Sequence, residues 1–199
     1  LETSALEDMA QVSEVMRACC AMGVSFALDD FGTGYSSLTY FKRLPAAILK
    51  IDRSFVRDML NDPEDLAILE GVLGLATAFR RQAIAEGVES TEHGELLLKL
   101  GCQLAQGYHI AKPMAADELP KGMEAWSPPS EWVNQMSVSH DDLPALFASV
   151  EHRAWVRMIN EYIQGKRSEP PPRGHHECRF GQWLYNEGEI RYGTGADFQ

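Results

Sequence analysis

The sequence DDFGTGYSS, at residues 29–37, decides the fold prediction. It follows a short, mainly apolar run at residues 24–28. We therefore expect a strand that ends in two adjacent carboxylates, Asp29 and Asp30, and then opens into a glycine-rich loop. Paired carboxylate oxygens suit Mg²⁺ or Mn²⁺, and they repel each other unless a cation neutralises them. Taken alone, the stretch also fits an Asp-rich turn that caps the next helix.

The residues around this loop alternate between strand and helix patterns, the helices having apolar residues at three- and four-residue steps. Strands are expected at residues 24–28, 46–51, 83–88 and 104–110, and helices at residues 4–22, 64–82 and 91–100. This alternation predicts an α/β fold with a parallel sheet covered by helices. Polar residues gather where the strands end, which is typical of the active-site face of a (β/α)8-type barrel. Four strands close only half of such a barrel and leave open edges.

Three further polar side chains follow the later strands. Lys50 could orient or deprotonate a water molecule at a metal ion, but a lysine at a strand end often only extends into solvent. Glu86 could bind a metal ion or be held by the dipole at a helix N-terminus. Gln106 could be an ordinary hydrogen-bonded amide in a loop. Together with the two aspartates, these residues indicate one shared site at the strand ends.

The composition limits the function classes. The net charge of −11 leaves no basic surface for binding a nucleic-acid duplex, so a ligand that carries phosphate would need a metal ion or a few placed cations. The four cysteines form no disulfide pattern and indicate a reducing, cytoplasmic setting. No membrane segment or signal peptide is visible. The chain begins at Leu1 without an initiator methionine, and we expect it to be a fragment.

These motifs resemble the EAL family of bacterial cyclic-di-GMP phosphodiesterases. That family carries a DDFGTG loop, a lone lysine on the next strand, an EGVE motif and a QGY motif. All four are present in order, at residues 29–38, at Lys50, at residues 86–89 and at residues 106–108. The resemblance covers about residues 1–120, and the expected EAL domain spans residues 1–126. It implies that the four strands are the C-terminal half of a (β/α)8-type barrel. It implies hydrolysis of cyclic-di-GMP to linear pGpG at a site with two Mg²⁺ or Mn²⁺ ions.

The resemblance also implies roles for single residues. Asp29, Asp30 and Glu86 would bind the metal ions, Lys50 would act on the attacking water, and Gln106 would hold the water or the site. The expected catalytic residues are Lys50, Glu86 and Gln106.

Four more positions match the family outside this group. Glu2 corresponds to a glutamate that steadies the DDFGTG loop. Gly107, Tyr108 and Pro113 correspond to positions near the guanine pocket, where they would contact the substrate. The Glu-Ala-Leu triplet and two other family residues would lie upstream of Leu1. We therefore expect the 199-residue chain alone not to hydrolyse cyclic-di-GMP.

The last third of the chain has a different character. Residues 127–140 form an expected linker, with SPPS at its start, and a helix is expected at residues 141–164 with Asp141 as its N-cap. A short segment at residues 175–184 follows a run of prolines. His152, His175 and Cys178 are candidate Zn²⁺ ligands, although the pattern also fits a surface His pair beside a buried cysteine.

This second region resembles the chemoreceptor zinc-binding, or CZB, family. An H-x-x-W element matches at His152 and Trp155, and an H-x-x-C-x-x-G-x-W element matches at residues 175–183. The expected CZB-like domain at residues 141–199 is incomplete, because a further histidine of the pattern is not found. Cys178 on a zinc ion would suggest redox or metal sensing.

The favoured function is therefore metal-dependent hydrolysis of cyclic-di-GMP, regulated by a zinc-binding module. One alternative is a cyclic-di-GMP receptor without catalysis. Another is a zinc or redox sensor whose EAL part serves for dimerisation. We expect a homodimer for each of these functions, because related domains pair near the DDFGTG loop.

Overall fold

The computed structural model describes residues 9–33, 38–172, 174, 179–188 and 190, and it divides into two compact units. The first unit contains the described residues up to Met59 together with Glu64–Ser137. The second contains Leu60–Pro63 and the described residues from Val138 onward. Within the described ranges, none of the helices combines the length and apolar character needed to cross a membrane.

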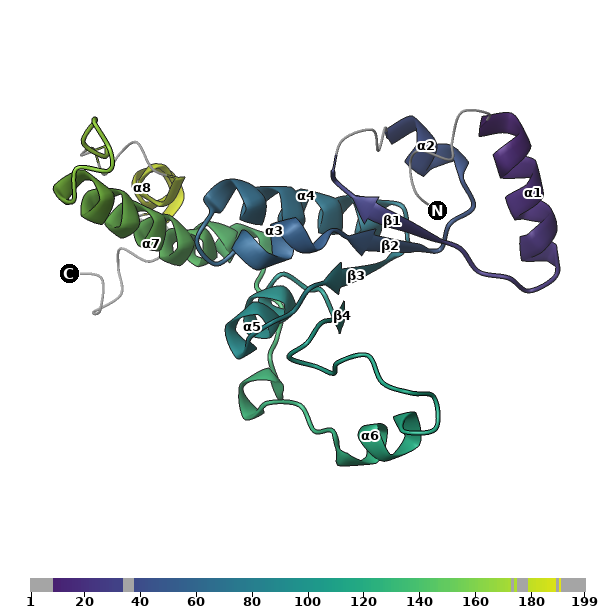
Figure 1. Cartoon of the computed structure of the whole chain (residues 1–199). Coiled ribbons are helices and arrows are strands. Elements are labelled where there is room, and N and C mark those ends of the chain that lie inside the picture. Colours follow the sequence, from purple (N-terminus) through teal and green to yellow (C-terminus); the bar gives the residue numbers. More distant parts are fainter. Residues whose placement is uncertain (1–8, 34–37, 173, 175–178, 189, 191–199) are drawn as a thin grey trace. The chain divides into compact units, whose positions relative to one another are not determined.

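A parallel four-stranded sheet forms the centre of the first unit (Figure 1). The strands are β1 (Ala27–Phe31), β2 (Ile48–Ile51), β3 (Gln82–Glu86) and β4 (Leu104–Gln106), and they lie side by side in chain order. Each neighbouring pair is parallel. Parallel neighbours need a crossover connection, and helices supply it between successive strands. The predicted α/β fold with a parallel sheet is confirmed.

The helices of this unit are α1 (Met9–Ala21), α2 (Leu38–Arg43), α3 (Arg53–Asp58), α4 (Pro63–Ala78), α5 (Thr91–Lys99) and α6 (Leu119–Ala125). The sequence patterns predicted α1, α4 and α5. They missed α2 and α3, which have six residues each, and α6, none of whose residues is buried. Short helices carry too few turns for a clear apolar period, which explains the omission.

Several element boundaries differ from the prediction. The first strand begins at Ala27 instead of residue 24 and continues to Phe31, one residue beyond the two aspartates at which it was expected to end. Helix α4 ends at Ala78 and not at residue 82, because Arg80 adopts a left-handed conformation (φ 54°) and the chain turns into β3. Strand β4 ends at Gln106, since the amides of Ile110 and Ala111 both donate to the carbonyl oxygen of Gly107 and form a turn.

Apolar residues of the strands and helices meet in one core. Leu49 and Ile51 of β2 are fully buried, as are Leu66 and Leu69 of α4. The buried residues of α4 recur at three- and four-residue steps between Leu66 and Ala76, so they form one side of the helix. The strand ends are thereby fixed on a rigid base.

The predicted linker at residues 127–140 belongs largely to the first unit, which extends to Ser137. A 3-10 helix, η2 (Ser130–Trp132), lies within it, and the indole of Trp132 packs on α5. The prolines around residue 128 indicated a linker, and they do not reveal a packed indole.

The second unit is helical. A 3-10 turn, η3 (His140–Asp142), leads into α7 (Leu143–Ile163), which is followed by α8 (Arg179–Trp183) and a π-helical turn, η4 (Leu184–Gly188). The long helix was predicted, but Asp141 is not its N-cap. Asp142, the last residue of η3, holds that position without a side-chain capping hydrogen bond.

Candidate active site

A β-bulge aims the two aspartates of β1. Leu28 pairs with Leu49 and Phe31 pairs with Ile51, so three steps along β1 face two along β2. Asp30 takes up the extra residue in a left-handed conformation, with φ 50°. Neighbouring side chains in a regular strand point to opposite faces, and the bulge removes that restriction for this pair.

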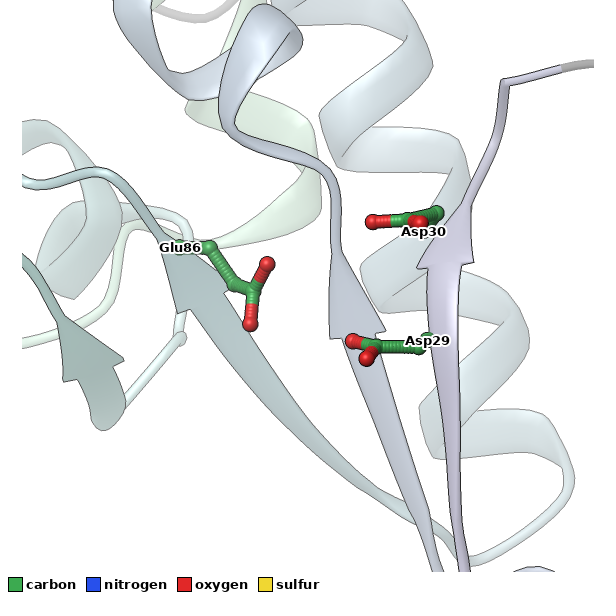
Figure 2. Close-up of side chains that lie close together, drawn as sticks. All are labelled: Asp29, Asp30 and Glu86. Atoms are coloured by element: carbon green, nitrogen blue, oxygen red, sulfur yellow. The ribbon is translucent and has the colours of Figure 1, made fainter. Parts of the chain in front are cut away.

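Three carboxylates therefore lie close together (Figure 2). Asp29 and Asp30 come from β1, and Glu86 reaches toward them from β3 across the intervening strand β2. One carboxylate oxygen from each of the three lies within 4.8 Å of the others. Three negative charges at this separation repel one another, so the group fits one or more divalent cations.

Lys50 lies on β2, between the two carboxylate-bearing strands. Its Nζ is 2.7 Å from Asp29 Oδ1, and it also forms an ion pair with Glu86. Burial lowers the pKa of Lys50, but the hydrogen bonds and negative charges of Asp29 and Glu86 outweigh burial, so its pKa lies above the ordinary value. Lys50 is therefore an ammonium group here, which can donate hydrogen bonds but cannot accept a proton.

Gln106 joins the group from the end of β4. Its Nε2 donates to Glu86 Oε1 over 2.7 Å. This bond fixes one oxygen of Glu86, which Lys50 also contacts. We predicted that polar side chains from successive strand ends lie together, and in the structure they do.

Glycines of the motifs allow the loops after the strands to nest closely. A Cβ on Gly107 would overlap the backbone of Val88, at 2.7 Å from its carbonyl carbon. Gly87 has φ 80°, and a Cβ there would lie 2.7 Å from Arg53 Cβ. Gly87 and Gly107 are thus required by close contact with neighbouring segments. These contacts pack the segments that follow β2, β3 and β4 against one another.

Asp52 is a further acidic residue at this edge that the sequence analysis did not single out. Its carboxylate caps α3 by accepting a hydrogen bond from the Ser54 amide over 2.8 Å. Burial raises its pKa, but hydrogen bonds from Ser54 and then the charge of Arg53 and a bond to Asp30 lower it below the ordinary value. An Asp directly before a helix is an N-cap signal that could have identified it.

The other predicted site residues of the first unit lie at its surface or outside the described part. Tyr108 is 65% exposed, and Lys112 Nζ lies 5.9 Å from the centre of its ring. Pro113 is also exposed, and Gly107 is half-buried. Glu2 lies outside the described residues.

For the predicted zinc site, the structure describes His152 alone. It is exposed on α7, and its ring stacks near that of Trp155, with centroids 6.2 Å apart. The Trp155 Nε1 donates to the Pro172 carbonyl oxygen over 2.8 Å, which fastens the proline run to this helix. His175 and Cys178 lie outside the described residues.

Comparisons with known proteins agree with these features. The model of the EAL domain matches residues 1–113, and the model of the chemoreceptor zinc-binding domain matches residues 152–199. The bifunctional diguanylate cyclase/cyclic di-GMP phosphodiesterase MucR of Pseudomonas aeruginosa is 42% identical over 118 residues, which are 59% of this chain and 17% of MucR. The chain spans no more than 24% of the length of the curated relatives that it matches first.

Solved structures show the same likeness. The PaMucR phosphodiesterase in complex with c-di-GMP is similar with a TM-score of 0.57 and 41% identity, over 60% of this chain and 49% of that one. The EAL domain of Mycobacterium smegmatis DcpA is similar with a TM-score of 0.60 and 40% identity, over 64% of this chain and 58% of that one. The chain therefore belongs to the EAL domain family and carries a chemoreceptor zinc-binding domain after its EAL region.

Proposed function

We propose that this chain supplies the catalytic carboxylates for the hydrolysis of cyclic-di-GMP to linear pGpG. The observation that carries the proposal is the convergence of Asp29, Asp30 and Glu86, with one oxygen of each inside 4.8 Å. The relatives support cyclic-di-GMP as the substrate, since MucR is a bifunctional diguanylate cyclase/cyclic di-GMP phosphodiesterase and its solved phosphodiesterase holds c-di-GMP.

The three carboxylates would hold Mg²⁺ or Mn²⁺. Their oxygens are hard ligands of the type these ions prefer, and a bound cation would relieve their mutual repulsion. When bound, a pair of such ions supplies Lewis acidity and a nucleophile at neutral pH. The ions would also attract the phosphates of the substrate to a chain whose net charge is −11.

The neighbouring polar groups would position the reactants. Lys50, as an ammonium group, would orient a water molecule or a phosphate oxygen by donating hydrogen bonds. Gln106 would keep Glu86 in place through their 2.7 Å hydrogen bond. The exposed ring of Tyr108 would offer a flat surface for a guanine base, with Gly107 and Pro113 shaping the loop around it.

We also propose that the four strands are the C-terminal half of a (β/α)8-type barrel. The chain matches 49% and 58% of the two solved EAL chains described above, which supports this assignment. The other half would complete the metal ligands and cover the open edges of β1 and β4. The 199-residue chain alone would then be inactive, and a homodimer would form through the region around the DDFGTG loop.

For the second unit we propose Zn²⁺ binding by His152, His175 and Cys178, with a regulatory effect on hydrolysis. Imidazole and thiolate together are ligands typical of zinc. The hydrogen bond from Trp155 to Pro172 supports the proposal, because it brings the chain three residues before His175 onto the helix that carries His152.

The test is hydrolysis of cyclic-di-GMP, with Mn²⁺, by this chain and by a longer form of the protein that carries a complete EAL domain. We expect pGpG from the longer form and none from the 199-residue chain. Binding of cyclic-di-GMP without pGpG in the longer form would instead identify a receptor. Turnover that does not change on titration with Zn²⁺ would contradict the regulatory role, and sedimentation would measure the dimer.

A further inference from the structure

Trp132, in η2, packs closely on the start of α5. Its Nε1 donates to the carbonyl oxygen of Thr91 over 2.8 Å. Its ring lies where a side chain at Gly94 would be, because a Cβ on Gly94 would overlap ring carbons and lie 2.5 Å from Nε1. A hydrogen bond and a glycine surface thus hold the indole in one orientation.

The same indole contacts His109. The two ring centroids lie 5.7 Å apart at an interplanar angle of 57°, which is a favourable tilted arrangement. His109 Nε2 also lies 3.1 Å from Thr91 Oγ1. Thr91 therefore connects the two rings, and α5, Trp132 and His109 form one contact group.

His109 belongs to the loop that leaves β4 directly after the candidate active-site residue Gln106. Its amide donates to the carbonyl oxygen of Val88 over 3.0 Å, and the Val88 amide donates to the carbonyl oxygen of Gln106 over 3.1 Å. Strand β4 has three residues and pairs with β3 at the end of the described sheet. So short a strand gives Gln106 little support of its own, and the loop contacts must fix its direction.

We infer that Trp132 is a positioning residue for the candidate active site. Its indole holds His109 against α5, and His109 in turn holds the loop that aims Gln106 at Glu86. Residue 132 lies in the interval between the EAL match at residues 1–113 and the zinc-binding match at residues 152–199. The functional part of the inference rests on the proposed phosphodiesterase function.

A purely structural role for Trp132 makes a different prediction. If the indole only covered α5, its removal would weaken the whole first unit, and all its strands would open more often. If it positions the loop, the effect concentrates on the Val88 and His109 amides, while Leu49 in the middle strand keeps its protection.

Amide hydrogen exchange on the 199-residue chain separates the two roles without requiring activity. Trp132→Ala is expected to speed exchange at Val88 and His109 about tenfold, and Leu49 less than twofold. Gly94→Ala should act in the same way, because its new Cβ displaces the indole. Trp132→Phe keeps a ring but loses the Nε1 hydrogen bond, and should speed exchange about threefold.

Trp126→Ala is the matched control, because Trp126 lies in the same segment and is 45% exposed. It should leave all three amides unchanged. Unchanged exchange at Val88 and His109 in Trp132→Ala would overturn the inference, and so would an equal increase at Leu49.

Kinetics in the longer form of the protein then test the link to the active site. Trp132→Ala should lower kcat about tenfold, because Gln106 and Glu86 lose alignment, and it should also raise KM, because Tyr108 lies in the same loop. Equal kcat in wild type and Trp132→Ala would overturn the functional part. A wild-type protein without turnover would contradict the proposed function and leave the exchange result to decide the positioning role.

Discussion

The candidate metal ligands that the structure describes lie on strands in the first unit, the sheet unit, and on a helix in the second unit, the helical unit. In the sheet unit, strand pairing and a bulge place Asp29, Asp30 and Glu86 together. In the helical unit, the described candidate, His152, is exposed on α7, and His175 and Cys178 lie outside the described residues. The comparison indicates that strand backbones preorganise the first site, whereas the zinc binding that we propose for the second would couple to folding. Metal removal should therefore affect the two units unequally.

The largest effect is expected from Asp30→Asn. Asn tolerates the left-handed conformation of residue 30, so the bulge should survive while one negative charge is lost. Turnover by the longer form should fall about 1000-fold, which equals about 4 kcal/mol of transition-state stabilisation. In EDTA, the unfolding temperature of the sheet unit should stay the same or rise, because repulsion among the carboxylates decreases.

Asp58→Asn is the control for this variant, since Asp58 is paired with Arg57 outside the carboxylate group. It should keep normal turnover. If Asp30→Asn unfolds the sheet unit in EDTA, the carboxylate at residue 30 supports the fold, and the proposed contrast between the two units is wrong.

Zinc removal should produce the next largest effect, and only in the helical unit. At free Zn²⁺ about 1000-fold above Kd, binding adds about 4 kcal/mol to stability. A chelator should then reduce the exchange protection of the buried Val150 in α7 by about 1000-fold and leave Leu49 in β2 unchanged.

His152→Ala should abolish the dependence of Val150 protection on zinc, because it removes one candidate ligand. Protection that falls equally in both units would show that they do not differ in metal dependence. If the exchange protection of Val150 does not depend on zinc, the proposal of a zinc site is wrong.

Gly107→Ala tests whether backbone packing supports the first site. The added Cβ would overlap the backbone of Val88, which cannot move without disturbing β3, so we expect the sheet unit to lose about 3 kcal/mol in a urea titration. Gly71→Ala is the matched control, since no atom lies within 4 Å of a Cβ there and the residue is inside helix α4. It should add about 0.5 kcal/mol. Equal stability of the two variants would contradict the nesting of the loops.

The sequence predicted the sheet and its polar edge well because both depend on local patterns. Apolar strands recur between periodic helices, and motif residues such as Lys50 and Gln106 occupy strand ends. The bulge at Asp30 was not predicted, since it depends on register with β2. The contact of Trp132 with Thr91 joins residues 41 apart. Its one sequence signal was Gly94, a glycine inside a predicted helix.

The smallest effect should come from Lys50→Arg in metal-free protein. The pKa of Lys50 is raised because Asp29 and Glu86 outweigh burial, so the folded state binds this proton more tightly than the unfolded state. Its contribution, about 0.5 kcal/mol for a partly exposed pair, is complete below about pH 10.4 and is lost as the pH rises through the folded-state pKa. Arginine stays charged across that range. The wild type should therefore lose stability relative to Lys50→Arg above about pH 10.4 in thermal unfolding, whereas Lys99→Arg, at the looser pair with Glu95, should follow the wild type. If the unfolding temperatures of wild type and Lys50→Arg change in parallel up to pH values above that range, the carboxylates do not hold Lys50 in its charged form. The preorganised sheet site would then lack its internal counter-charge.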